Sequence, residues 1–317
     1  MRTRLRRAAA ALVAGALAPS VALAHEGCPV APHDFREASA WIPAPGSLAL
    51  VVASAMVYAL GVRALRRAAG PDRGIRRWER NAFAAGWLVL AVALVTPLHP
   101  LGESLLSAHM TQHELIMVVA APLLVLGRPL VAAVWALPPA MRPGVGRAAR
   151  VPWFAAAWRW ISAPFAAWLL HALAIWGWHA PRLYEATRTN GWLHAAQHTS
   201  FLLTALLFWW ALLRPRSGGL GAGAGIVYVF TTALHTSVLG ALMAFSTSLW
   251  YPAYAVSTPM WGIDPVDDQQ LAGLIMWVPG GIAYLLAALA LMRRLLDGGR
   301  HEAAERRARA VTAGRTA

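Results

Sequence analysis

The sequence predicts an all-α membrane protein, a helix bundle of seven transmembrane helices that follows a cleavable signal peptide. Hydrophobic residues make up 58% of the 317 residues, and charged residues only 13%. Six or seven apolar runs are long enough to cross a bilayer core, which takes about 20 helical residues. The runs lack the alternation of barrel strands, so helices are the structure that satisfies their backbone hydrogen bonds in lipid.

The N-terminus has the features of an export signal. Residues 1–7 carry four Arg, residues 8–21 are apolar, and small residues stand at Ala22 and Ala24. This arrangement predicts a signal peptide over residues 1–24, cleaved to give an exported segment over residues 25–46. An uncleaved extra span is the alternative.

Proline and charged residues set the limits of the membrane domain, which we assign to residues 47–296. The Gly-rich stretch 218–225 joins two spans as a flexible linker, and no strand precedes it as in a phosphate-binding loop. The predicted spans are Ser47–Leu65, Ala82–Leu98, Ser107–Leu126, Ser162–His179, Trp192–Leu213, Gly225–Ser246 and Gln269–Met292.

Arginine is distributed very unevenly between the two sides of these spans. All 28 basic residues are Arg, and 25 of them fall on one side. The other side has only Arg36, Arg182 and Arg188. The positive-inside rule makes the Arg-rich side cytoplasmic. A signal peptide places residue 25 outside and seven spans return the Arg-rich tail, residues 297–317, to the inside, so the two arguments agree.

The net charge of +14 is therefore an orientation signal of a protein whose partner is the lipid bilayer. Nucleic-acid binding is excluded as its cause, because the Arg residues are spread over loops that flank the spans.

Histidine shows the opposite distribution. Nine of the eleven lie in the exported segment or in the spans, His99 directly follows the second span on the outer side, and only His301 lies on the cytoplasmic side. His109 and His113 open the third span, and His194 and His198 open the fifth. Both pairs are spaced four apart, so each pair shares one face of its helix. Because both helices start from the outside, the two pairs lie at matching depth.

A bundle that turns these faces inward would hold several imidazoles in one layer. Imidazole suits copper, zinc and iron, and Met110, Met117 and Met243 are possible soft ligands for Cu(I). A single membrane histidine is often a packing residue, but two matched pairs with further histidines favour a metal centre. The candidate ligands are His109, His113, His171, His179, His194, His198 and His235.

Four polar residues are candidates for orienting these ligands. Gln112 and Gln197 each precede the second histidine of a pair. Asp267 and Asp268, just before the last span, could accept hydrogen bonds from ligating imidazoles. The alternative role for either aspartate is to cap the N-terminus of that span.

Three segments have a distinctive sequence, namely Ser107–Glu114 with Ala121–Gly127, Gln197-His198 with Leu206–Trp210, and Asp268–Gly281. They resemble signatures of a known family, the CtaG-type cytochrome c oxidase assembly factors of caa3-type oxidases. The resemblance runs from about Trp41 to Leu296, and only Glu114 departs clearly, at a position that is usually apolar.

The resemblance implies a non-enzymatic protein of the bacterial cytoplasmic (inner) membrane that handles copper for a haem-copper oxidase. It implies a metal role for His109, His113, His198 and His235. Its partners would be cytochrome c oxidase subunits and a periplasmic copper chaperone. Two alternatives stay open, a copper transporter and a haem-binding redox protein with axial histidines such as His113 and His198. The apolar inner half below His235 argues against a channel.

Overall fold

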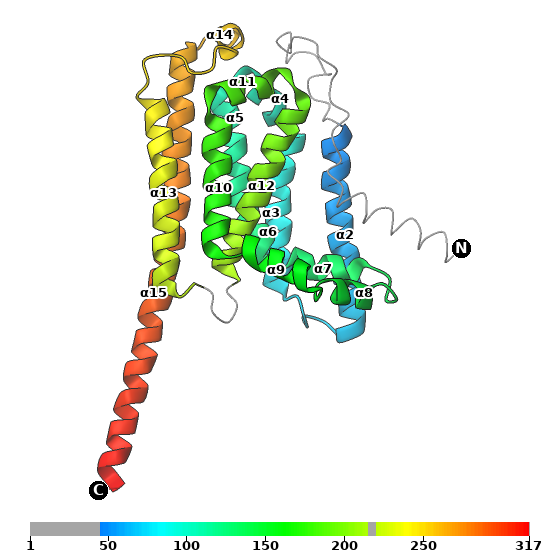
Figure 1. Cartoon of the computed structure of the whole chain (residues 1–317), viewed down its shortest axis with the longest axis vertical. Coiled ribbons are helices and arrows are strands. Elements are labelled where there is room, and N and C mark those ends of the chain that lie inside the picture. Colours follow the sequence, from blue (N-terminus) through cyan, green and yellow to red (C-terminus); the bar gives the residue numbers. More distant parts are fainter. Residues whose placement is uncertain (1–44, 215–219, 317) are drawn as a thin grey trace.

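The computed structural model describes residues 45–214 and 220–316, and helices are the only regular secondary structure in that part of the chain (Figure 1). The predicted signal peptide and nearly all of the predicted exported segment, with His25 and His33, lie outside the described residues. The all-α prediction is confirmed for the part of the chain that can be described.

Six helical segments could cross a bilayer by length and composition. The third is built from three consecutive pieces, α5, the π-helix η2 and α6. The segments are α2 (Pro45–Ala69), α3 (Arg77–Val95), α5 (Leu106–Glu114) with η2 (Leu115–Ala120) and α6 (Ala121–Leu126), α12 (Gly191–Leu213), α13 (Ala222–Ala244) and α15 (Pro265–Thr316).

The predicted fourth span, Ser162–His179, is the exception. Helix α10 (Pro164–His179) has 16 residues, which at 1.5 Å each is short of the roughly 30 Å bilayer core. The preceding helix α9 (Pro152–Ile161) meets α10 at 63°, and the two make a seventh span only if counted as one bent pair. Proline explains the break, because Ala163 before Pro164 is held in an extended conformation.

Shorter helices close the two ends of the bundle. The Arg-rich stretch Arg128–Arg159, between the predicted third and fourth spans, folds into α7 (Pro129–Ala136), α8 (Arg142–Ala148) and α9 at one end (Figure 1). Trp153 and Trp160 of α9 are exposed, as in helices that lie in a membrane interface. The opposite end carries α4 (Leu98–Ser104), α11 (Pro181–Thr189), α14 (Tyr254–Ser257) and the 3₁₀ turn η3 (Thr258–Trp261).

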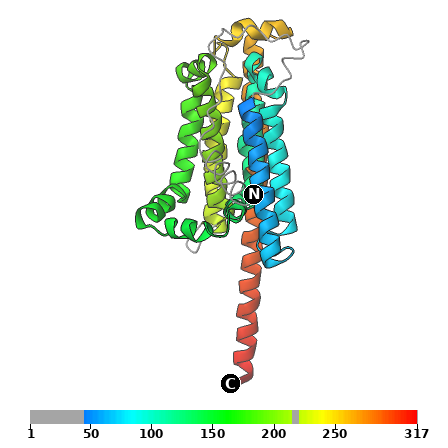
Figure 2. The same cartoon turned by 90° about the vertical axis from the view of Figure 1, so that its right-hand side faces the viewer.

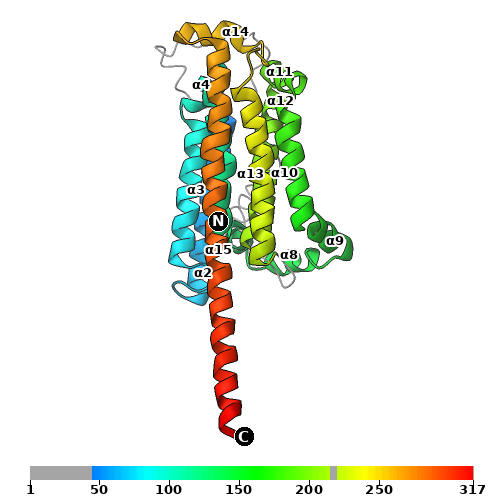
Figure 3. The same ribbon diagram turned by 90° about the vertical axis from the view of Figure 1, so that its left-hand side faces the viewer.

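Helix α15 runs the full length of the bundle and projects beyond it at the Arg-rich end (Figures 2 and 3). It lies against α13 at a point where both helices have glycine. A Cβ atom added at Gly273 would stand 2.5 Å from the Gly240 carbonyl oxygen. Small residues allow this close backbone approach, which is a main source of helix association in lipid.

Helix α5, which carries the first histidine pair, lies in the centre of the molecule. Its segment is the most buried of the six candidate spans. The π-helix η2 begins directly after His113 and Glu114, and the Trp209 indole donates to the Met117 carbonyl oxygen inside it at 2.9 Å. Such π segments are frequent beside functional sites.

Candidate metal centre

Six histidines from four helices form one connected group at the end of the bundle away from the Arg-rich loops. Neighbouring rings lie 4.3 Å apart for His109 and His113, and 4.6 Å apart for His194 and His198. The two pairs also meet, since the His113 and His198 ring centroids are 5.1 Å apart. The predicted convergence of α5 and α12 is therefore present, and the group is His99, His109, His113, His179, His194 and His198.

Two sets of three histidines are close enough to share a metal ion. The outer triad is His99, His194 and His198, and the inner triad is His109, His113 and His198. In each triad one nitrogen from every ring lies within 4.8 Å of the others. A metal with bonds of about 2.0–2.1 Å to imidazole nitrogen needs these atoms closer still, which small side-chain rotations provide.

Several ring nitrogens of this group are buried and have no hydrogen-bond partner among the described residues. Both nitrogens of His113 are buried without a hydrogen bond among the described residues, as is the Nε2 atom of His109, of His194 and of His198. A buried polar atom without a partner costs about 1–3 kcal/mol, so native structures rarely keep one without a reason. A metal ion bound by one lone pair of each ring removes most of that cost, and the residues therefore fit a metal site.

His179, at the end of α10, lies beside the inner triad. Its Nδ1 donates to the Ile175 carbonyl oxygen at 2.6 Å, which leaves the Nε2 lone pair buried and unpartnered. Its ring centroid is 6.3 Å from that of His113. A histidine held through Nδ1 to a backbone carbonyl is a common arrangement for a metal ligand that binds through Nε2.

His99 joins the group, although it was not among the predicted ligands because no other histidine lies one helical turn away from it in the sequence. It lies on α4, which packs closely on α5, since a Cβ on Gly102 would stand 3.1 Å from the His109 Cα. The Gln112 amide nitrogen donates to His99 Nδ1 at 2.9 Å and to the Ala93 carbonyl oxygen at 2.7 Å. Burial lowers the pKa of His99, so the ring is neutral and able to ligate near pH 7.

His171 and His235 were predicted as ligands but lie apart from both triads. His171 Nδ1 donates to Thr204 Oγ1 at 3.1 Å, and His235 Nδ1 accepts from the Trp176 indole at 3.3 Å. Neither histidine belongs to a described three-ligand group. Helical spacing predicts the depth of each histidine on its own helix, α10 or α13, but it does not predict whether that histidine reaches a common metal centre.

The two predicted aspartates have other roles. Asp268 accepts from the Leu106 amide at 2.6 Å, from the Ser107 amide at 3.2 Å and from the Ser107 hydroxyl. It therefore caps α5 from a neighbouring helix, and its recorded bonds do not reach an imidazole. Asp267 is exposed, and Asp264, which accepts from the Val266 amide at 2.8 Å, caps α15. Helix α15 begins four residues before the predicted span, which explains why the cap was misplaced.

Replacing Asp268 with Ala should loosen the start of α5, just before His109 and His113. Losing an N-cap costs about 0.5–2 kcal/mol, so the thermal unfolding midpoint of the purified protein should fall and the histidine group should retain an added metal ion less well. Asp267→Ala is the matched control and should leave both unchanged. Equal midpoints for the two variants would contradict the cap.

Gln197 is fully buried, and neither its amide nitrogen nor its oxygen has a hydrogen-bond partner among the described residues. Gln197 lies three residues after His194, on the same side of α12, and it remains a candidate for contact with a bound group. Met110, Met117 and Met243 are buried in the apolar core.

A tyrosine cluster that sequence reasoning missed covers the inner triad. The Tyr184 ring lies 5.5 Å from that of His109, and its hydroxyl is 2.8 Å from that of Tyr254. The Tyr254 hydroxyl donates to the Gly102 carbonyl oxygen at 2.8 Å, which ties this cover to α4. Burial raises the pKa of Tyr184, so the cover stays uncharged. The tyrosines come from separate short helices far apart in the sequence, so no local pattern predicts that they meet.

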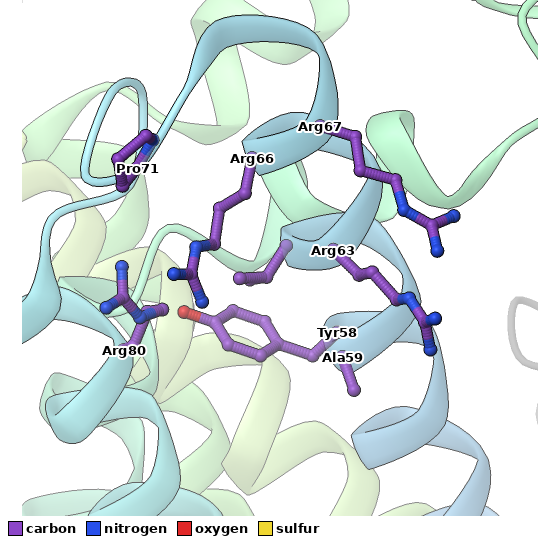
Figure 4. A pocket seen from close by; sticks show the side chains of 8 residues that line it. Tyr58, Ala59, Arg63, Arg66, Arg67, Pro71 and Arg80 are labelled. Carbon is purple, nitrogen blue, oxygen red and sulfur yellow. The ribbon is translucent and has the colours of Figure 1, made fainter.

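A cavity of about 680 Å³ lies at the other end of the molecule and does not serve as this centre (Figure 4). Arg66 and Arg80 lie near the Tyr58 hydroxyl, and the Arg63 and Arg67 side chains extend away from it. A guanidinium group has only donors and cannot ligate a metal. The cavity belongs to the Arg-rich end of the bundle.

Comparison with known proteins places the chain in a family. It is 27% identical over 259 residues to uncharacterized proteins Mb0105 of Mycobacterium bovis and MT0111 of Mycobacterium tuberculosis, covering 76% of this chain and 37% of theirs. It is 25% identical over 258 residues to uncharacterized protein ML1998 of Mycobacterium leprae, covering 77% of this chain and 38% of that protein.

The chain thus spans less than two fifths of the length of these relatives. No solved structure matches it. The sequence family of cytochrome c oxidase caa3 assembly factors matches residues 56–297 of this chain, which include every histidine of both triads. The resemblance seen in the sequence is confirmed, and the chain belongs to the cytochrome c oxidase caa3 assembly factor family.

Proposed function

We propose that this protein helps to assemble a haem-copper cytochrome c oxidase by holding copper as cargo in its histidine group. The observation that carries the proposal is the inner triad, in which His109 and His113 each expose only 1% of their surface and keep unpartnered ring nitrogens. Holding and delivering cargo needs no turnover chemistry. The partners would be oxidase subunits and, as copper donor, a periplasmic copper chaperone.

The donor set favours copper among the metals that imidazole binds. All the ligand atoms of the two triads are imidazole nitrogens, which disfavours hard ions such as Mg²⁺ and Ca²⁺. Copper stands highest in affinity for nitrogen sites among the divalent metals, and imidazole also suits Cu(I). Copper is, besides, the metal that the partner oxidase requires.

The two alternative functions receive less support. A haem needs its axial rings on opposite sides of a macrocycle, but the His113 and His198 rings are in edge-to-face contact at 5.1 Å. A transporter needs a polar path to the other side, and the inner half of α12, Ala205–Leu213, is wholly apolar.

The proposal is tested by the absorption spectrum and metal content of purified protein. We expect bound copper after loading and no intense haem band in the visible spectrum. A protein that binds haem, or that binds neither copper nor haem, would overturn the copper-holding function.

We further propose that the histidine end faces the periplasm of a bacterial inner membrane and the Arg-rich end faces the cytoplasm. Reporter fusions after Arg294 and within Arg63–Arg80 should report a cytoplasmic location, because Arg-rich flanks are retained inside. A fusion within Thr258–Val266 should report a periplasmic one. A periplasmic location of the fusion after Arg294 would reverse the orientation and put the histidines on the wrong side for a periplasmic donor.

A further inference from the structure

We propose that the histidine group is a two-position relay, in which copper is taken up by the outer triad and passed to the inner triad while His198 stays bound. The proposal rests on the copper-holding function. Its geometric basis is that His198 is a member of both triads.

The shared ligand makes the two positions alternatives. A neutral imidazole has one ring nitrogen with a free lone pair, because the other carries the proton. His198 can therefore bind one copper ion at a time, and the chain is expected to hold one ion in the relay. Passage breaks the bonds to His99 and His194 and forms bonds to His109 and His113. The copper keeps its oxidation state, and no net proton is gained or lost by the five rings.

The two triads are close enough for these exchanges to occur one ligand at a time. His109 lies between them, with its ring centroid 5.6 Å from that of His194 and 5.6 Å from that of His198. On the outer side, the His99 and His194 rings are 5.3 Å apart. A leaving ligand can thus be replaced before the ion loses its remaining partners.

Exposure sets the order of the two positions. His99 and His194 are partly exposed, His198 exposes 9% of its surface, and His109 and His113 expose 1% each. An ion arriving from outside therefore meets the outer triad first. The inner triad is covered by Tyr184 and its hydrogen bond to Tyr254.

Hydrogen bonding makes the inner triad the better final position. His99 Nδ1 already accepts from Gln112, which places the ring proton on Nε2, so His99 must give up this arrangement to bind copper through Nε2. His113 has no hydrogen bond to lose at either ring nitrogen. Copper binding to His99 in the outer triad therefore costs a hydrogen bond, whereas copper binding to His113 in the inner triad costs none.

The test uses full-length protein in detergent micelles, with Cu(I) as the probe and a water-soluble Cu(I) chelator as the competitor. Three variants are compared with wild type, namely His99→Ala with His194→Ala, His109→Ala with His113→Ala, and His198→Ala. His171→Ala with His235→Ala is the matched control, because it also removes two membrane histidines but leaves both triads intact. The readouts are copper per chain, the loading rate and the rate of removal by chelator.

Each variant has a distinct expected result. Losing the outer pair should slow copper loading at least about tenfold, while removal of copper by the chelator stays slow. Tenfold is a lower bound, because losing even a hydrogen-bond partner of a metal ligand typically costs about 10–100-fold. Losing the inner pair should keep fast loading but speed removal by a similar factor. His198→Ala should impair both rates, and the control should match wild type. If a double variant is not recovered folded, His99→Ala and His109→Ala carry the same two expectations.

The relay and the copper-holding function fail in different ways. Wild-type protein that binds no copper would overturn the function itself. Copper binding with equal changes of loading and removal in the outer and inner variants would leave the function standing and replace the relay with a single site. Two copper ions per wild-type chain, or normal rates in His198→Ala, would overturn the sharing of His198.

Discussion

Replacing His113 and His198 together with Ala is expected to abolish most copper binding while the protein still accumulates in the membrane. The substitution removes two of the three inner ligands and the ligand that both triads share. Affinity should fall by at least about 100-fold, since even a lost partner of a metal ligand costs up to that much. Cytochrome oxidase activity should fall in parallel, and added copper should restore part of it.

The fold should survive because these histidines contribute little to packing. Three of their ring nitrogens are buried without hydrogen-bond partners, so removing them relieves a polar cost that offsets the lost contacts. Helix association in lipid depends mainly on van der Waals packing of small residues.

The measurement is copper content and oxidase activity of membranes, beside an immunoblot for the protein. His171→Ala with His235→Ala serves as the control for loss of membrane histidines. Full oxidase activity in the His113 and His198 double variant, at normal protein levels, would contradict the copper role and favour a scaffold.

Replacing Gly273 with Ala is expected to damage the fold strongly. The new Cβ would lie 2.5 Å from the Gly240 carbonyl oxygen and 2.5 Å from the Ala244 amide nitrogen. Both are backbone atoms, so no rotamer change relieves the overlap, and α13 and α15 must separate. Overpacking of this kind costs about 1–3 kcal/mol and occasionally more.

The effect should extend to the metal centre, because α15 also carries Asp268, the cap of α5. The yield of monodisperse protein, its thermal midpoint and its bound copper should all fall. Gly281→Ala is the matched control on the same helix, since its Cβ would meet nothing within 4 Å. If Gly273→Ala behaves like Gly281→Ala, the close contact between α13 and α15 does not stabilise the bundle.

The sequence alone determined the class of the protein and the layer in which its paired histidines lie. Composition required membrane helices, and the spacing of four within His109–His113 and His194–His198 placed each pair on one helix face. The three signature segments named a family that the family match over residues 56–297 confirms. Each of these conclusions rests on local spacing or on overall composition, and both are properties of the linear sequence.

Only the tertiary structure decided which histidines meet. It brings His99 into the outer triad through the close packing of α4 on α5 at Gly102, and it leaves His171 and His235 outside both triads. It also turns Asp268 toward the amides of α5. Helical periodicity fixes the direction of a side chain on its own helix, but the rotation and height of one helix against the next are set by contacts between distant residues. Those contacts, such as that between Gly240 and Gly273, have no periodic signal in the sequence.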